Sequence, residues 1–266
     1  MSISPGNKPA ILVVHGVQLG EDSDLNQDES IRELVLSRLN GTHFEFDVDL
    51  YKYENISDDS LDKFKKLSKL IISSPIGSAI APSVIDIVGD VVISLANNST
   101  ADKIRKGLKA KILEYYNAGT SLYIVAHSLG TVYLFDVINE LISDKAYFNR
   151  DDILEWPVQG MITIGSPLGL AMFKKTGRKT AKNLGKGRYN FKWLNYFDVN
   201  DPVVSGNIFG KALTSVKIAE KYKKDGNNFG WFIRDFPVDT GRTWLLAHTA
   251  YWDSAVVGDG LVNMMV

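Results

Sequence analysis

Residues 121–130 read SLYIVAHSLG, an apolar run followed by a serine that stands between small residues. The run at 121–126 is typical of a strand that is buried on both faces of a sheet. Apolar side chains then recur at helical spacing over 129–142, which predicts an amphipathic helix. The stretch therefore predicts a strand, a sharp turn at Ser128 and a helix, and this unit indicates the fold.

The same alternation of strands and helices extends to both sides of this unit. The further predicted elements are strands at 10–14, 44–51, 160–164 and 193–197, and helices at 30–39 and 102–116. Strands that alternate with helices indicate βαβ units, a mainly parallel sheet and an α/β fold. The length of 266 residues fits one domain over 1–266. Functional groups are expected on the loops that leave the carboxyl ends of the strands.

The composition excludes several classes of protein. No cysteine is present, so disulfides are ruled out, and the formal net charge of −1 argues against a nucleic-acid binder. The amino-terminal residues lack the pattern of a signal peptide, a basic segment followed by an apolar core and a small-residue cleavage site. We therefore expect a soluble protein of the cytoplasm.

The segment 56–100 has long apolar stretches that Pro75, Pro82, Asp86 and Asp90 interrupt. Charged residues at the centre of a membrane-spanning helix are costly, so we reject a transmembrane helix here. Two interpretations stay open. The segment is either an inserted helical lid, which would suggest a long acyl substrate, or a pair of helices packed on the core.

Charge is unevenly distributed along the chain. The segment 174–192 holds eight basic side chains and no acidic one. Such a run is most often a solvated helix and loop. The functional alternative is a platform for an anionic substrate or an anionic membrane surface, and binding to it would depend on salt.

The five residues AHSLG at 126–130 differ from the pattern G-x-S-x-G by one methyl group, at Ala126. In that pattern the serine sits on a strained strand-to-helix turn, with its hydroxyl above the edge of the sheet. The helix that follows directs free N–H groups at charge that develops near the serine. Ser128 is therefore the candidate nucleophile, and a serine that only caps a helix is the alternative.

A serine hydroxyl needs a base, and the four histidines of the chain can be compared. His15 ends the first predicted strand, which is too early for a base in this topology. His43 lies in a polar turn, and His127 adjoins the serine, so we expect its side chain to point away. Elimination leaves His248 as the base, with a structural histidine as the alternative.

The acid that orients the base is expected after a strand between the serine and the histidine. The segment 195–203, NYFDVNDPV, offers Asp198 at the end of a strand and Asp201 in the loop beyond it. We favour Asp201, because Pro202 restricts the loop where this carboxylate could reach an imidazole N–H, whereas Asp198 would begin the turn. The chain order of serine, acid and histidine is that of α/β-hydrolases.

Backbone N–H groups are expected to bind the oxyanion that forms during acyl transfer. The candidates are Val17, in the loop after the first strand, and Leu129, directly after the serine. We assign His15, Gly16 and Ser166 to the substrate-binding region. Gly16 permits a close approach there, while Ser166 and the proline after it would mainly shape their own loop.

Five segments together resemble one known family. They are VVHGV at 13–17, AHSLGTVYLFDV at 126–137, TIGSPLGL at 163–170, NYFDVNDPVV at 195–204 and AHTAYW at 247–252. The chain is similar in these segments to a bacterial branch of the α/β-hydrolase superfamily, related to lipases, esterases and GPI inositol-deacylase-like proteins. The resemblance implies an eight-stranded, mostly parallel sheet and hydrolysis of a carboxylic ester through an acyl-enzyme. It also implies the roles given above to Ser128, Asp201 and His248.

The leading hypothesis is a serine esterase or lipase-like hydrolase that cleaves carboxylic esters, lipid or acyl esters among them. This chemistry requires no metal and no organic cofactor. Two alternatives stay open. One is a protein of the same fold that binds a partner or ligand without turnover. The other is a phospholipase effector or toxin that acts on a membrane, and the basic segment 174–192 is the observation that suggests it.

Overall fold

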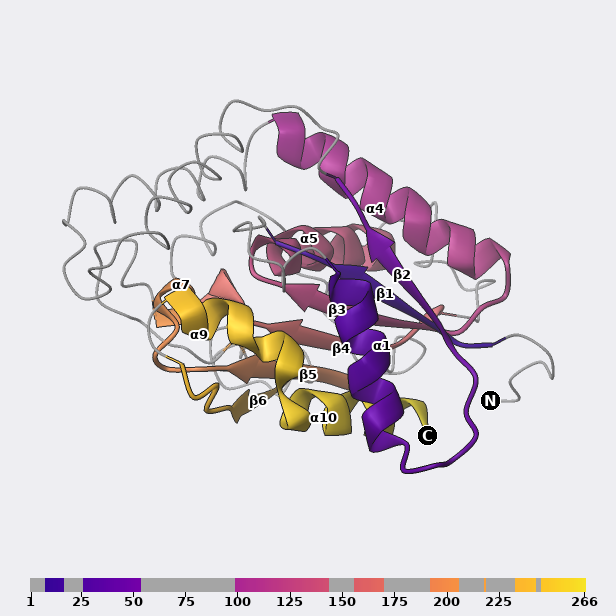
Figure 1. The fold of residues 1–266 in the computed structure, drawn as a ribbon. Coiled ribbons are helices and arrows are strands. Elements are labelled where there is room, and N and C mark those ends of the chain that lie inside the picture. Colours follow the sequence, from indigo (N-terminus) through magenta and orange to yellow (C-terminus); the bar gives the residue numbers. More distant parts are fainter. Residues whose placement is uncertain are drawn as a thin grey trace, which may run out of the picture.

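The structure is a computed structural model that describes residues 8–16, 26–53, 99–143, 156–169, 192–205, 218, 233–242 and 245–266. Within these residues the strands are β1 (Ala10–Val14), β2 (Asp47–Tyr51), β3 (Leu122–His127), β4 (Val158–Ile164), β5 (Lys192–Phe197) and β6 (Ile233–Pro237). They form one parallel sheet in the order β2-β1-β3-β4-β5-β6 (Figure 1). The described part of the chain therefore has an α/β fold with a six-stranded parallel sheet.

Helices flank both faces of this sheet (Figure 1). The long ones are α1 (Gln27–Arg38), α4 (Ser99–Asn117), α5 (Leu129–Ser143) and α10 (Ala255–Met265). In the strand order, β2 lies on one side of β1, whereas the chain moves in the opposite direction along the sheet from β2 to β3 and from β3 to β4. Right-handed crossovers therefore place α1 on one face and α4 and α5 on the other. The contacts agree, because α1 packs against α10 and α4 packs against α5.

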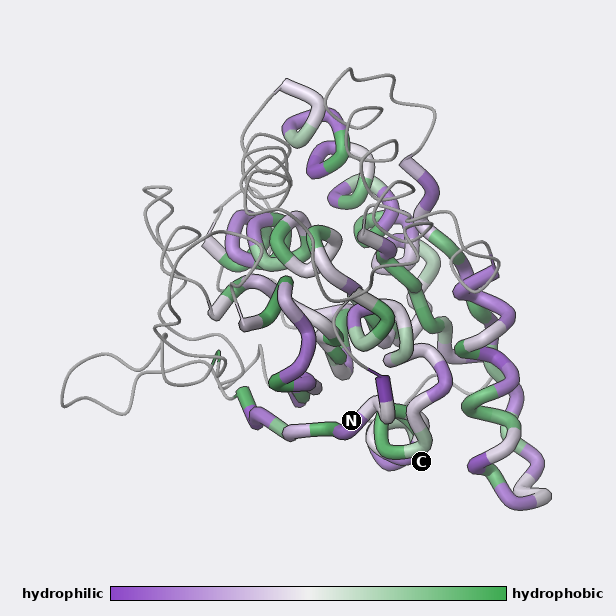
Figure 2. The backbone as a smooth tube through the Cα atoms, turned by 60° about the vertical axis from the view of Figure 1, so that its left-hand side comes forward, coloured by the Kyte–Doolittle hydropathy of each residue, from purple (hydrophilic) through white to green (hydrophobic). Residues whose placement is uncertain are grey.

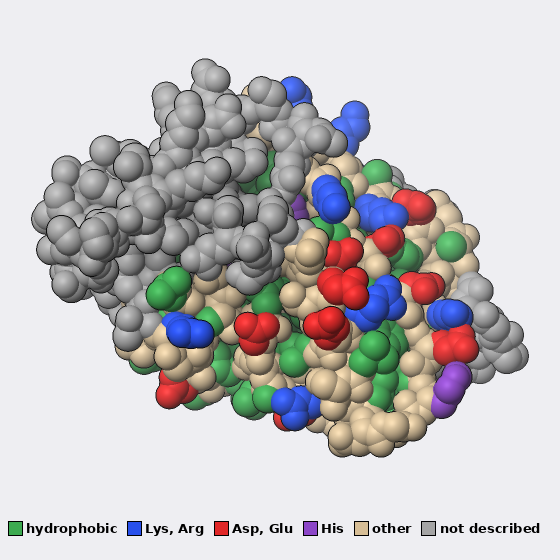
Figure 3. Space-filling view, in the orientation of Figure 1, with side chains coloured by type: hydrophobic (Ala, Val, Ile, Leu, Met, Phe, Trp, Pro, Cys, Tyr) green, Lys and Arg blue, Asp and Glu red, His purple; other side chains and the backbone are tan. Residues whose placement is uncertain are grey.

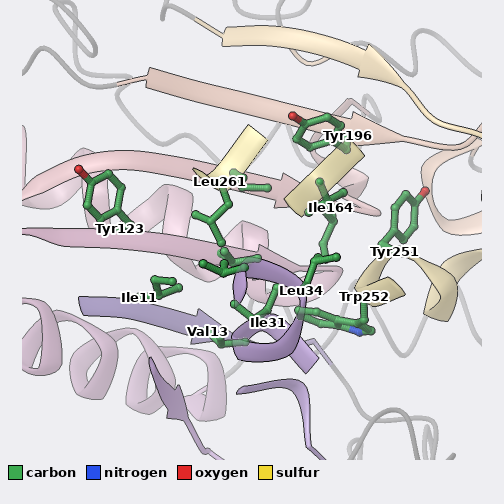
Figure 4. Packing of buried hydrophobic residues seen from close by; sticks show 14 of the residues in the cluster. Ile11, Val13, Ile31, Leu34, Tyr123, Ile164, Tyr196, Tyr251, Trp252 and Leu261 are labelled. Atoms are coloured by element: carbon green, nitrogen blue, oxygen red, sulfur yellow. The ribbon is translucent and has the colours of Figure 1, made fainter. Parts of the chain in front are cut away.

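The hydrophobic core on the α1 face is built on the central strands. Every residue of β1 and β3 is buried, as expected for strands that helices cover on both sides. Ile11 and Val13 of β1 lie in one cluster with Ile31 and Leu34 of α1, and Trp252 completes it from the carboxyl-terminal region (Figure 4). Burial of each large apolar side chain contributes ~1.5–3 kcal/mol, so this cluster holds α1 firmly against the sheet.

On the other face, α5 is the inner helix and α4 is the outer one. Nearly all of α5 is buried, whereas α4 buries a single stripe that includes Ile104, Leu108 and Ile112. Figure 2 shows hydrophilic and hydrophobic residues alternating along several of the helical turns. Arg105 of α4 joins the two helices through an ion pair with Asp136 of α5 at 3.3 Å. This ion pair joins α4 to the middle of α5.

Charged side chains of both signs are interspersed over the described part of the surface that Figure 3 shows. Several of them form ion pairs. Lys111 lies 3.1 Å from Asp49 and 3.4 Å from Glu114, and Lys8 lies 2.9 Å from Glu45. Exposed pairs of this kind contribute little to stability, so burial and not surface charge carries the fold.

Two glycines allow α10 to pack closely. A Cβ atom on Gly258 would lie 2.7 Å from Leu34 Cγ of α1, and one on Gly260 would lie 2.0 Å from the Tyr196 hydroxyl of β5. Neither approach is possible with a side chain present. The glycines therefore let α10 reach both α1 and the sheet, although glycine is unfavourable within a helix.

The predicted strands and helices are confirmed for the described residues, with ends that differ by a few positions. β6 and α10 were not among the elements predicted from the sequence. The resemblance implied eight strands, and the described residues form six. The lid at 56–100 and the basic segment 174–192 lie outside the described residues, apart from the first two positions of α4 and Lys192. No helix in the described ranges combines the length and the apolar character needed to cross a membrane.

The sheet has a switch point between β1 and β3, because the chain leaves these neighbouring strands toward opposite edges. In open parallel sheets, ligands bind at such a point, outside the carboxyl ends of the strands. Gly16 follows β1 and Ser128 follows β3 directly. The fold thus brings these two loops together at the place where a binding site is expected.

Candidate active site

Three side chains from distant parts of the sequence are linked by hydrogen bonds at the carboxyl-terminal edge of the sheet. His248 Nε2 lies 2.8 Å from Ser128 Oγ, and His248 Nδ1 lies 2.8 Å from Asp201 Oδ2. The partners assign the tautomer: Nδ1 carries the hydrogen and donates to the carboxylate, so Nε2 accepts from the serine hydroxyl. The structure therefore places the three residues of the expected triad in contact, in the order that general-base activation of a serine requires.

Ser128 occupies a strained turn between β3 and α5. Its φ of 53° lies in the left-handed region, which is uncommon for residues other than glycine. The turn is held by a hydrogen bond from the Ser128 N–H to the Ile164 carbonyl at 3.1 Å. Close packing holds it as well, since a Cβ on Gly130 would lie 2.3 Å from the His15 carbonyl oxygen. The predicted strand, sharp turn and helix are thus all present.

Hydrogen bonds between hydroxyl groups hold the backbone of this turn. Thr131 Oγ1 donates to the Ser128 carbonyl at 2.6 Å and lies 2.7 Å from Ser166 Oγ. Because the Thr131 hydrogen is used at Ser128, Ser166 is the donor to Thr131. Ser166 Oγ accepts in turn from the Leu168 N–H at 3.3 Å. Ser166, which the sequence assigned to substrate binding, is buried and is linked to the strained turn through Thr131; a contact with substrate stays a prediction.

The two acid candidates occupy different positions. Asp201 is fully buried, and its Oδ1 accepts from the Val203 N–H at 2.8 Å, at the start of the short helix α7 (Pro202–Ser205). The Asp198 carboxylate instead accepts from the Asn200 N–H at 2.8 Å and from the Thr240 hydroxyl at 2.7 Å. Asp198 thus shapes the turn after β5, and Asp201 is the carboxylate that contacts the imidazole.

His127 does not point away from the site as expected. Its Nε2 lies 2.8 Å from the His248 carbonyl oxygen, and its ring lies 4.6 Å from the His248 ring. The His127 ring also lies 5.2 Å from the Trp252 ring, with an angle of 67° between the planes. Burial first, and then the charge that His248 can carry, hold the pKa of His127 well below 6.5, so this ring stays neutral. The neutral Nε2–H donates to the main chain that carries His248.

The loop after β1 borders the serine. A Cβ on Gly16 would lie 3.1 Å from Ser128 Oγ, which places this backbone directly at the site. His15 is buried, and its ring stacks on Tyr53 at 4.4 Å with an angle of 10° between the planes. The Tyr53 hydroxyl donates to the Gly16 carbonyl at 2.7 Å and fixes this loop from the β2 side. His43 lies on the surface, as expected.

Of the two backbone N–H groups expected to bind the oxyanion, the structure describes Leu129 but not Val17. Leu129 is the first residue of α5, so its N–H is one of the four that a helix leaves without an intrahelical partner. Val17 lies outside the described residues. Among the residues that the structure describes, no group of three or more His, Cys, Asp or Glu side chains could hold a metal ion.

Tyr251 is a site residue that the sequence analysis missed. It lies in the 3-10 turn η5 (Ala250–Asp253), which follows the helix α9 (Leu245–Thr249) that carries His248. Its hydroxyl donates to Asp201 Oδ2 at 2.9 Å and accepts from the Asp198 N–H at 2.8 Å. Burial first, and then the charge of Asp201, raise the pKa of Tyr251 well above 10, so the phenol stays protonated.

Comparisons with known proteins give similarity in structure only. No protein-family model matches the chain, and no curated protein matches it significantly. TT1662 from Thermus thermophilus is similar with a TM-score of 0.47 and 13% identity, over 99% of this chain and 90% of that one. One structure described under "LipS and LipT, two metagenome-derived lipolytic enzymes" is similar with a TM-score of 0.42 and 11% identity, over 98% of this chain and 94% of that one. The chemistry of the site therefore has to be judged from its own geometry.

Proposed function

We propose that this protein is a serine hydrolase of the α/β-hydrolase type that cleaves carboxylic esters. One observation carries the proposal: the imidazole of His248 makes 2.8 Å contacts with the Ser128 hydroxyl on one side and the Asp201 carboxylate on the other. The strained turn at Ser128 and the position at the switch point of the sheet support it.

The first half of the reaction acylates the serine. His248 Nε2 takes the proton of Ser128 Oγ as this oxygen attacks the carbonyl carbon of the ester. The negative charge moves to the carbonyl oxygen, which the Leu129 N–H and, as the sequence suggests, the Val17 N–H would bind. His248 then gives its proton to the leaving alkoxide. The carbon–oxygen bond breaks, an alcohol departs and the acyl group remains on the serine.

The second half releases the acid. His248 Nε2 removes a proton from a water molecule, whose oxygen attacks the acyl carbon. The bond between this carbon and Ser128 Oγ then breaks, the carboxylic acid leaves, and the proton on His248 is transferred to Ser128 Oγ. Asp201 keeps the imidazole in the reactive tautomer throughout and stabilises the charged form of the ring. Because this carboxylate is fully buried, it acts through a medium in which charge is weakly screened.

The fold also holds the proposed reacting groups in their orientations before a substrate binds. Ser128 is held by Ile164 and Thr131, and His248 is held through its own carbonyl by His127. Groups that are oriented before the substrate binds need little reorganisation during the reaction, which is a large part of enzymatic rate enhancement. The proposed residues are therefore supported by contacts that leave the reacting atoms free to react.

The size of the acyl group is a further part of the proposal. A lid at 56–100 would favour long acyl chains, and a basic segment at 174–192 would favour substrates presented on an anionic surface. A phospholipase acting on membranes would show activity on anionic vesicles that falls when salt is raised. Activity on such vesicles that does not change with salt would count against this part.

The test is a series of esters of increasing acyl length, assayed with the wild type and with Ser128→Ala. We expect hydrolysis by the wild type and a loss of ~10³-fold or more in the variant. Ser37→Ala is the control, because Ser37 lies on the outer side of α1 and bonds only the Leu34 carbonyl in the described contacts. Equal rates for the wild type and Ser128→Ala, or no hydrolysis by either, would overturn the proposal and favour a binding protein of this fold.

A further inference from the structure

The Asp201 carboxylate receives two side-chain donors at the same oxygen. His248 Nδ1 approaches Oδ2 at 2.8 Å, and the Tyr251 hydroxyl approaches Oδ2 at 2.9 Å. Tyr251 and Asp201 are both fully buried. The phenol is itself oriented, because its oxygen accepts the Asp198 N–H at 2.8 Å from the end of β5. Geometry thus aims the phenol hydrogen at the oxygen that also holds the imidazole.

We propose that Tyr251 is a positioning residue that holds the Asp201 carboxylate and weakens its pull on the imidazole of His248. The inference rests on the proposed function and deepens it, since it concerns the same site. Tyr251 does not touch the reacting atoms; it acts through Asp201. The hydrogen bond draws negative charge toward the phenol, so less of it faces Nδ1.

The spacing of the residues explains how one segment supplies both groups. His248 lies in the last turn of α9 and Tyr251 follows three positions later in η5, so the two side chains leave the same side of this turn. Trp252, the next residue, points into the core cluster beside α1, whereas the Tyr251 hydroxyl points out of that cluster (Figure 4). The core contact of Trp252 therefore anchors the segment that presents both groups to Asp201.

The other titratable groups around the pair are few among the described residues. His127 faces His248 from the end of β3, and burial keeps it neutral. Asp198 faces Tyr251 from the end of β5, and its carboxylate is engaged by Thr240 and Asn200. Tyr251 stays protonated across the working range because burial and the charge of Asp201 raise its pKa. Tyr251 is therefore a hydrogen-bond donor to Asp201 over the whole pH range of the test.

The inference predicts the direction of a change in pH dependence. Without the phenol hydroxyl, the full charge of Oδ2 faces Nδ1–H, and the imidazolium form of His248 becomes more stable. The serine is reactive only when the imidazole is neutral, so the acid limb of reactivity moves to higher pH in Tyr251→Phe. A role in packing alone would lower stability or total activity and leave the midpoint of this limb unchanged.

The experiment measures the rate constant for covalent inactivation by a fluorophosphonate from about pH 5 to about pH 9. We expect the midpoint of the acid limb to rise by ~0.5 pH unit in Tyr251→Phe. Tyr51→Phe is the matched control, because it also removes one hydroxyl with a protein acceptor, the Ile104 carbonyl at 2.8 Å, but far from the triad in sequence and contact. Its midpoint should equal that of the wild type.

A second variant keeps the inference testable if Tyr251→Phe fails to fold. Site-specific replacement of Tyr251 by 3-fluorotyrosine retains the ring and the hydroxyl and makes the phenol a stronger donor. The midpoint should then fall below that of the wild type. An unchanged midpoint in a folded variant of either kind overturns the inference while leaving the proposed function intact. A wild type that does not react at all overturns the proposed function, and the inference with it.

Discussion

A Cβ atom on Gly16 would lie 2.5 Å from the Cβ atom of Ser128, closer than such atoms approach in proteins. The loop after β1 and the turn after β3 are therefore in direct contact. Any larger residue at position 16 has to displace one of them. Since the Ser128 hydroxyl lies 2.8 Å from His248, the displacement falls on the contact that the proposed chemistry needs.

We predict that Gly16→Ala lowers kcat/KM for esters by ~10²-fold, because small displacements of a nucleophile have effects of this size. The control is Gly41→Ala. A Cβ there meets nothing within 4 Å, but the φ of 81° makes alanine unfavourable. That variant should lose ~1–2 kcal/mol of stability and keep its activity. Wild-type activity in folded Gly16→Ala would show that the contact is not required.

Replacement of aspartate by asparagine should have different effects at the two acid candidates, Asp201 and Asp198. Asp201→Asn should lower kcat by ~10⁴-fold, because an amide no longer keeps His248 in the reactive tautomer. Asp198→Asn should mainly lower the free energy of unfolding, by ~1–3 kcal/mol, because it disturbs the hydrogen bonds to Asn200 and Thr240. Ester kinetics and denaturant unfolding of both variants check this. The reverse pattern would make Asp198 the acid.

The buried His127 should make the free energy of unfolding depend on pH. Its folded pKa lies well below the unfolded value of 6.5, because of burial first and then the charge on His248. Below pH 6.5 the unfolded chain therefore binds a proton that the folded protein does not bind. The free energy of unfolding should fall with decreasing pH, by up to ~1.4 kcal/mol per pH unit from this group alone.

His127→Gln provides the comparison, because the amide can donate to the His248 carbonyl but does not titrate. Urea unfolding should show a shallower loss of stability below about pH 6.5 in the variant, and equal slopes above it. Identical slopes below that pH would mean that His127 is protonated in the folded protein.

Ser166 offers a test between substrate contact and support of the turn. Its hydroxyl donates to Thr131, which donates to the Ser128 carbonyl. If Ser166 acts through this chain, Ser166→Ala lowers kcat by a few fold and stability by ~1 kcal/mol, with KM unchanged. Thr131→Val should lower both in the same way. A rise in KM at unchanged kcat would instead assign Ser166 to the substrate.

The parts of the fold that the sequence predicted are those with a simple pattern. The apolar run of β3 is buried throughout, and its burial follows from composition alone. β6 was missed because only Ile233 of its five residues is buried, as at a sheet edge. α10 was not predicted, and it contains Gly258 and Gly260, residues that are unfavourable within a helix. Their role is visible only when Leu34 and Tyr196 are seen against them.

The order of the three candidate residues along the chain could be predicted from the sequence, but the residues that contact and hold them could not. The pattern at 126–130 and the order of acid and histidine along the chain predicted that Ser128, Asp201 and His248 meet, and the structure brings these side chains into contact. Their roles in catalysis stay a proposal. The contact of the His127 side chain with His248 was not predicted, because it depends on where the segment that carries His248 lies in the fold. Tyr251 was missed, although an aromatic residue three positions after a candidate histidine was a usable signal.

The most direct test of the account is to trap the covalent intermediate. The protein is mixed with an activated ester, quenched within the first turnover, digested and analysed by mass spectrometry, with Ser128→Ala in parallel. The account predicts one acyl group per chain on the peptide that contains Ser128, and none in the variant. An acyl group on another residue, or hydrolysis that proceeds equally well without Ser128, would contradict it.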